Sequence, residues 1–148
     1  MKEELVTFET AKLAKSRGFK APCRSFYPTV DVNGYEEGIL NEYCGYGHYS
    51  FAEAPTQSLL QRWLREEHNI LISIYSNASG YLWNMMYAIG GTDIGWSEYS
   101  GDDEASGTFT TYEKALEAGL QESLKLIKCY CGHTTYCDCG PEQEAKQS

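Results

Sequence analysis

Long apolar runs and positive charge are both scarce in this sequence of 148 residues. The longest strongly apolar stretch, around Ile70–Tyr75, is far shorter than the about 20 residues that a membrane-spanning helix needs. The first residues mix charges throughout and lack the continuous apolar segment of an export signal. We therefore expect a soluble protein located in the cytoplasm, with no membrane partner.

The shortage of positive charge bears on the choice of partner. The chain has 12 Lys and Arg residues against 21 Asp and Glu residues, which gives a formal net charge of −9. Binding to nucleic-acid phosphates depends on Lys and Arg, so direct nucleic-acid binding is not expected. The acidic surface serves solubility, mimics nucleic acid or docks on a basic partner, and solubility is the simplest explanation.

Motifs of common enzyme classes are missing as well. The sequence contains no P-loop, EF-hand or HExxH pattern. The segment Gly95–Tyr99 resembles a nucleophile elbow but lacks its second glycine. An enzyme is therefore less expected than a binding protein.

Three helices are predicted from apolar spacing and end signals. Thr7 is a suitable N-cap for a helix over Phe8–Arg17, and Gly18 suits the position just after its end. A second helix is expected to begin at Pro55, because proline fits the first helical position, and to end near His68. A third begins with a capping box at Thr110–Glu113 and runs to Ile127. His68 is expected to interact with the dipole at the end of its helix.

Strands are predicted where the apolar period is two or where aromatic residues replace a helical pattern. Ile70, Ile72 and Ile74 alternate along one strand, and a turn at Asn77–Gly80 leads into the next. The other predicted strands are Cys23–Val32, Ile39–Tyr46 and a short one near Ile94–Ser97.

The element order is α-β-β-α-β-β-(β)-α, which favours an α+β fold. We expect an antiparallel sheet of four to five strands with three helices packed mainly on one face. Residues 1–128 are expected to form a single domain, residues 129–140 an appended cysteine-rich hairpin, and residues 141–148 a disordered tail.

Three segments carry a likeness to a known group of proteins: VTFETAKLAKSRGF, YSFAEAPTQSLLQRWLREEHNILISIY and FTTYEKALEAGLQESLKLI. In these the chain resembles a family of small uncharacterised proteins encoded by bacteriophages and mobile elements of gut Bacteroides-type bacteria. The likeness covers most of residues 5–127, and the APTQ…LLQRWLRE block is its most specific part. The family has no assigned activity, so the resemblance implies a biological context and no catalytic residues.

The cysteine-rich segment CYCGHTTYCDC is the place where spacing points to chemistry. Folded as a hairpin, it would bring four sulfurs to one side, because residues two apart share a face of a strand. Thiolates kept reduced in the cytoplasm often bind zinc, and four of them would close a structural site. The predicted metal ligands are Cys129, Cys131, Cys137 and Cys139, with His133 able to replace one of them. The alternative is a flexible tail without a metal.

Two further groups of residues attract attention. Residues 43–51 combine tyrosine with glycine and histidine, as recognition loops do, and the candidate binding residues are Tyr43, Tyr46, His48 and Tyr49. The alternative is that they are ordinary strand and rim aromatics. Cys23 and Cys44 fall on predicted strands, as a redox pair or, more simply, as small buried side chains.

Three functions remain open at this point. The first is a non-enzymatic accessory protein of a phage or mobile element that acts by binding an unknown macromolecule, most simply a protein. The alternative is a small zinc-binding protein with a structural C-terminal thiolate site. The third is an enzyme of unknown class that uses the Tyr/His-rich region 43–51.

Overall fold

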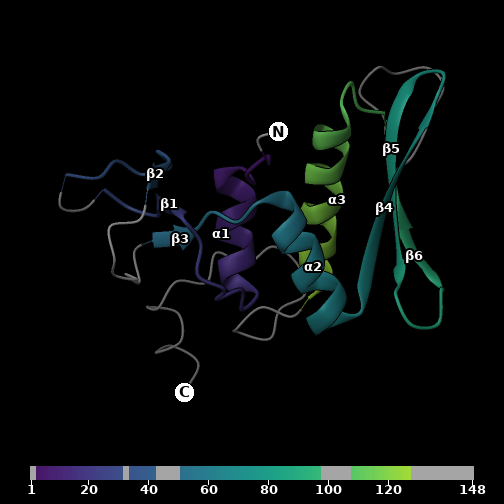
Figure 1. Cartoon of the computed structure of the whole chain (residues 1–148), viewed down its shortest axis with the longest axis horizontal. Coiled ribbons are helices and arrows are strands. Elements are labelled where there is room, and N and C mark those ends of the chain that lie inside the picture. The colour runs from purple at the N-terminus through teal and green to yellow at the C-terminus, as the bar shows by residue number, and fades with distance from the viewer. Residues whose placement is uncertain (1–2, 32–33, 43–50, 98–107, 128–148) are drawn as a thin grey trace. The chain divides into compact units, whose positions relative to one another are not determined.

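The computed structural model describes residues 3–31, 34–42, 51–97 and 108–127 of the chain (Figure 1). In chain order, the described residues form α1 (Phe8–Ser16), β1 (Ser25–Pro28), β2 (Asn41–Glu42), β3 (Phe51–Glu53), α2 (Gln57–His68), β4 (Ile70–Asn77), β5 (Gly80–Tyr87), β6 (Asp93–Trp96) and α3 (Tyr112–Leu126). The α+β class predicted from the sequence is confirmed.

The strands are divided between two small antiparallel sheets, not gathered in one. One sheet has the order β2-β1-β3 and the other has the order β4-β5-β6. The single sheet of four to five strands was therefore wrong in its arrangement. Alternation shows which residues form a strand, but strand pairing depends on contacts between distant parts of the chain.

The chain also divides into two compact units, one for each sheet. The N-terminal unit consists mainly of Leu5–Thr56 and takes in Leu124, and the hairpin unit consists mainly of Gln57–Ser123. The expectation of a single domain over residues 1–128 stays a prediction.

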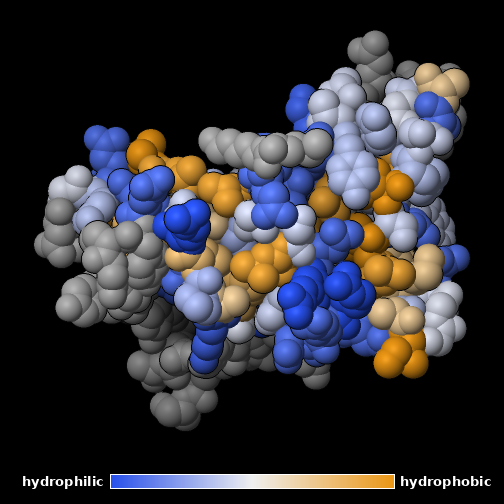
Figure 2. Space-filling model, in the orientation of Figure 1, coloured by the Kyte–Doolittle hydropathy of each residue, from blue (hydrophilic) through white to orange (hydrophobic). Residues whose placement is uncertain are grey.

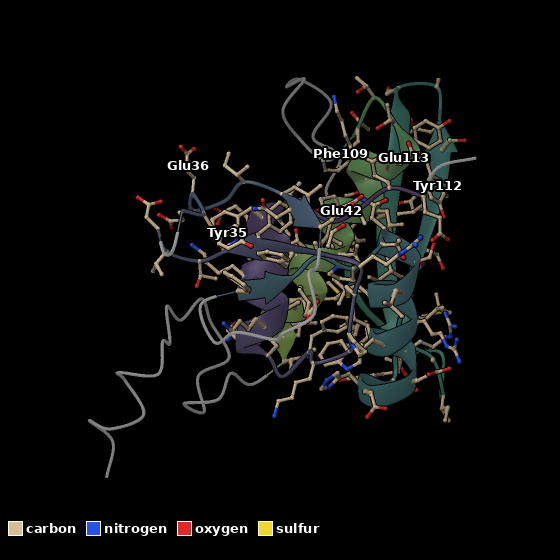
Figure 3. All side chains as sticks on the ribbon, turned by 60° about the vertical axis from the view of Figure 1, so that its left-hand side comes forward. Tyr35, Glu36, Glu42, Phe109, Tyr112 and Glu113 are labelled. Carbon is tan, nitrogen blue, oxygen red and sulfur yellow. The ribbon has the colours of Figure 1, made fainter. Side chains whose placement is uncertain are left out.

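The N-terminal unit is built around α1 and an aromatic cluster. Thr7 caps α1 as predicted: its Oγ1 accepts a hydrogen bond of 3.4 Å from the backbone N–H of Thr10. Gly18 takes the predicted left-handed conformation after the helix, with φ of 96°. The rings of Phe26 and Phe51 stack at 4.2 Å, and the ring of Tyr35 meets both of them edge-on. Figure 3 shows Tyr35 against the sheet β2-β1-β3 and Glu36 pointing away from it.

Strand β3 was not predicted, and its presence also moves the start of α2. The chain stays extended after β3, so that the carbonyl of Pro55 accepts a hydrogen bond of 3.0 Å from Val6 N–H and Thr56 bridges Leu5. Pro55 therefore lies before the helix, which begins two residues later at Gln57. The sequence signal for proline at the first helical position was wrong because a strand-like contact takes the residue first.

The hairpin unit has α2 and α3 on one face of the sheet β4-β5-β6 (Figure 1). Leu60 and Leu64 of α2 and Leu120 of α3 are completely buried. Ile72 and Trp83 lie under Gly119 of α3, where an added Cβ would sit only 3.0 Å from Ile72 Cγ2. Gly119 thus permits the close approach of the helix to the sheet.

Two details of the predicted helices differ from the structure. The N-cap of α3 is Thr111, whose Oγ1 accepts a 3.1 Å hydrogen bond from Lys114 N–H, so the capping box at Thr110–Glu113 is out by one residue. Gln61 has a polar side chain on α2, but it turns toward the sheet: its amide donates to the carbonyl oxygen of Ile72 over 3.0 Å.

Candidate interaction surface

The residues predicted to bind a metal or a partner all lie outside the described residues. They are Cys129, Cys131, His133, Cys137 and Cys139 in the cysteine-rich segment, and Tyr43, Tyr46, His48 and Tyr49 in the aromatic segment. Both sites stay predictions. Within the described ranges, no three His, Cys, Asp or Glu side chains come together in a way that would hold a metal ion.

Cys23 is the predicted redox residue that the structure describes. Its free thiol is half-buried, with Sγ 3.3 Å from the carbonyl oxygen of Ala21. Burial, helped by the negative charge of Glu53, raises the pKa of the thiol to about 12. A thiol that holds its proton this firmly is a weak nucleophile, which favours the structural role for Cys23. Cys44 lies outside the described residues, so the pairing of the two is untested.

The sheet β4-β5-β6 has a second face, turned away from α2 and α3, which we call the outer face. Cross-strand partners lie on the same face of an antiparallel sheet, so the strand register defines it. The register pairs Leu71 with Met86, Ser73 with Asn84, and Tyr75 with Leu82. Asn84 is in turn paired with Trp96 of β6. The outer face therefore carries Leu71, Ser73, Tyr75, Asn84, Met86 and Trp96, with Asp93 at its margin, while Leu82 on the same face is buried at 3% exposed.

Two large aromatic side chains stand exposed on this face. Trp96 is 60% exposed and Tyr75 is 47% exposed. Tryptophan and tyrosine are the residues most enriched at the energetic centres of protein interfaces. Polar Ser73 and Asn84 lie between the two aromatic residues and can exchange hydrogen bonds with a partner.

The described residues of the outer face carry little of the charge found in the rest of the chain. Among them Asp93, at the margin, is the one charged residue, whereas the formal net charge of the chain is −9. Figure 2 shows strongly hydrophilic residues gathered over α2, with apolar residues at the surface beside them. The hydrophilic residues on α2 include exposed Arg62, Arg65, Glu66 and Glu67. A neutral, partly aromatic face of this kind is suited to burial in an interface.

The backbone groups of β5 that point toward β6 have hydrogen-bond partners along the strand. Phe109 extends β6 by exchanging two backbone hydrogen bonds of 2.8 Å with Tyr81. Ser97 donates its N–H to the Trp83 carbonyl and accepts the Trp83 N–H on its Oγ. Phe109 and Tyr112, labelled in Figure 3, lie together at this end of the unit, and the ring of Tyr112 meets Tyr81 edge-on. These contacts hold the sheet in place beneath the outer face.

The outer face was not among the sites predicted from the sequence. Its signal is weak because Leu71, Ser73 and Tyr75 alternate with the isoleucines of β4 and read as the solvent side of an ordinary strand. Trp96 becomes part of the surface only through its pairing with Asn84, which the sequence does not reveal.

Comparison with known proteins gives no relative. No family model, curated protein or solved structure matches this chain. A separate finding concerns membranes: among the described residues, no helix combines the length and the apolar character needed to cross a bilayer.

Proposed function

We propose that the protein acts without catalysis, by binding another protein through the outer face of the sheet β4-β5-β6. The observation that carries the proposal is the exposure of Trp96 and Tyr75 together on one neutral face. Burying an exposed tryptophan and tyrosine in a partner releases water from a large apolar area, and their polar atoms can still be satisfied there.

The charge of the chain supports a protein partner in preference to a nucleic acid. Residues 25–148 carry six basic and eighteen acidic groups, a formal net charge of −12, which opposes approach to phosphates. The resemblance to phage and mobile-element proteins supports a role as an accessory protein that acts on a component of a bacterial host.

Partner capture from a lysate of a Bacteroides-type gut bacterium tests the proposal. The wild-type protein is compared with Trp96→Ala and with the control Ile89→Ala, since Ile89 is 84% exposed but lies beyond the end of β5. We expect a protein that is retained by the wild type and by Ile89→Ala and is lost with Trp96→Ala. Equal capture by all three, or no capture above background, would contradict binding through the outer face.

A second proposal is that the cysteine-rich segment binds zinc at a structural site. It is supported by the spacing of Cys129, Cys131, Cys137 and Cys139, which offers four thiolates and so matches a closed tetrahedral site. Native mass spectrometry before and after a chelator should show one zinc ion per chain. The ion should be lost in Cys131→Ser and kept in Cys23→Ser, since the high pKa of Cys23 makes its thiol a poor ligand. Failure to take up added zinc would refute the site.

A further inference from the structure

The outward-facing edge of β4 has backbone groups that receive no backbone hydrogen bond from the described residues. Every second residue of an edge strand directs its N–H and C=O away from the neighbouring strand. The carbonyl of Ile72 points this way, because it accepts the side-chain amide of Gln61 in α2. Ile74 and Ser76 follow in the same alternation, and within the described part of the chain no hydrogen bond reaches their backbone from the side away from β5.

This edge also lacks the features that usually prevent strand association. Strand β4 is eight residues long, ILISIYSN, with no proline, no charged residue and no register shift against β5. Edge strands are normally kept apart by lysine, proline, bulges or short length. The opposite edge has such protection: β6 is four residues long, begins at Asp93 and pairs with β5 through a register shift.

We propose that β4 pairs antiparallel with β4 of a second copy of this chain, about a two-fold axis at Tyr75. Ile74 then lies opposite Ser76 of the second copy, and each such pair exchanges both of its N–H···O bonds. Tyr75 faces its own counterpart in the pair without hydrogen bonds, where side chains of two strands come closest. The two sheets join into one, and the outward-facing backbone groups of Ile74 and Ser76 gain partners.

A second copy fits this edge better than a flexible peptide for two reasons. Its β4 is already a strand, whereas a flexible peptide loses conformational freedom when it is ordered on the edge. The strand is also uncharged, so two copies of a chain with net charge −9 meet here without opposing like charges. An antiparallel edge allows a closed two-fold dimer, which leaves no further copy to add at this edge.

The dimer is tested by sedimentation velocity of the full chain over a concentration series in a reducing buffer. Ser76→Pro removes the N–H that points outward, and proline is tolerated at such a position on an edge strand. We expect the wild type and the control Ser76→Ala to reach the mass of a dimer, and Ser76→Pro to dimerise at least about tenfold more weakly. A thermal unfolding curve close to that of the wild type shows that Ser76→Pro is folded.

Cross-linking at the axis gives a second measurement that does not depend on the proline variant. Opposed residues in the pair without hydrogen bonds have Cα atoms about 4.5 Å apart, a separation that a disulfide can bridge. Under oxidation with copper phenanthroline, Tyr75→Cys should give a peptide linked to itself at position 75. The control Ile89→Cys lies at a more exposed position and should not be linked in this way.

Three results would overturn the proposal: a wild type that stays monomeric at every concentration, a dimer unaffected by Ser76→Pro, or equal cross-linking at positions 75 and 89. The outcome is separate from that of the proposed function. Trp96→Ala lies on β6 and should weaken partner capture while leaving the dimer mass unchanged.

Discussion

At the scale of single residues, burial decides the chemistry of Cys23. With a pKa of about 12, its thiolate fraction at pH 8 is orders of magnitude below that of an ordinary cysteine, whose pKa is about 8.5. We expect iodoacetamide to label Cys23 at least about 100-fold more slowly in the folded protein than in urea. Peptide-resolved mass spectrometry separates Cys23 from the other five cysteines.

The variant Glu53→Gln isolates the smaller cause of this shift. Glu53 Oε2 accepts the backbone N–H of Cys23 over 3.2 Å, and glutamine retains an oxygen that can accept the same bond. Removing the negative charge should lower the pKa and speed labelling in the fold, but leave it slower than in urea, because burial is the larger cause. Rapid labelling of the folded wild type would show that the thiol is not shielded.

His68 shows burial acting against the effect expected from the sequence. The dipole at the end of α2 favours a charged ring, but the ring lies 4.6 Å from that of Trp63, and its burial there lowers the pKa. The negative charge of Glu67 raises the pKa by a smaller amount. The unfolded chain, with a histidine pKa of about 6.5, then binds a proton more readily than the folded protein, so stability falls as the pH drops through this value.

His68→Phe keeps a ring against Trp63 but cannot take up a proton. Urea unfolding measured between pH 7 and pH 5 should therefore show a shallower loss of stability in His68→Phe than in the wild type. Loss of the same steepness in both proteins would assign the effect to other groups.

At the scale of elements, Asn69 joins the end of α2 to the turn after β5. It has a left-handed φ of 57° and exchanges hydrogen bonds with Ile89, accepting the N–H on Oδ1 over 2.7 Å and donating from Nδ2 over 3.3 Å. Asn69→Gly keeps the conformation but loses both bonds, and should cost about 1 kcal/mol of unfolding free energy. Asn69→Ala should cost about 1 kcal/mol more, because alanine is strained at positive φ. Urea unfolding measures both, and a glycine variant as stable as the wild type would contradict this role.

Gly80 opens β5 at a point where another backbone comes very close. An added Cβ would sit 2.6 Å from the carbonyl oxygen of Phe109, and φ is 144°. Gly90 also has positive φ, 105°, but no atom within 4 Å of an added Cβ. Gly80→Ala should therefore cost about 2–3 kcal/mol and Gly90→Ala about 1 kcal/mol, since only the first adds a clash to the strain. Equal losses in urea unfolding would show that the Phe109 contact yields.

The elements that the sequence predicted best are those with local signals. Thr7 and Gly18 mark both ends of α1, and the isoleucines of β4 mark its buried face. Strand β3 has three residues and no alternating pattern long enough to recognise, and the start of α2 depends on contacts with residues near the N-terminus. Features determined by a few neighbouring residues can be predicted from the sequence, whereas features that depend on distant partners are visible only in the structure.

At the scale of the whole molecule, the same distinction separates the fold from the candidate site. The α+β class follows from the order of the elements, which is written along the chain. The outer face requires the pairing of β5 with both neighbours and the placement of both helices on the opposite side. The metal and aromatic sites predicted from spacing lie in residues 128–148 and 43–50, beyond the described ranges, and their tests are chemical.

The distribution of charge leads to a prediction for the whole chain. Residues 1–24 carry a formal net charge of +3, the one stretch that suggests affinity for a polyanion. Packing takes up several of its cations: Arg17 is 4% exposed and donates from Nε to the Leu124 carbonyl, and burial lowers the pKa of Lys15. Lys12 Nζ lies 5.2 Å from the centre of the Phe8 ring.

We therefore expect no saturable binding to single- or double-stranded DNA or to RNA in fluorescence polarisation at low salt. A salt series makes the assay specific for phosphate contacts, because binding that releases counterions must weaken steeply as salt is added. The variant Lys20→Glu serves as the control, since Lys20 is exposed and its reversal lowers the net positive charge of residues 1–24. Binding that is salt-dependent and lost in Lys20→Glu would show that the N-terminal charge is functional, and would replace the outer face with a nucleic-acid site as the first surface to study.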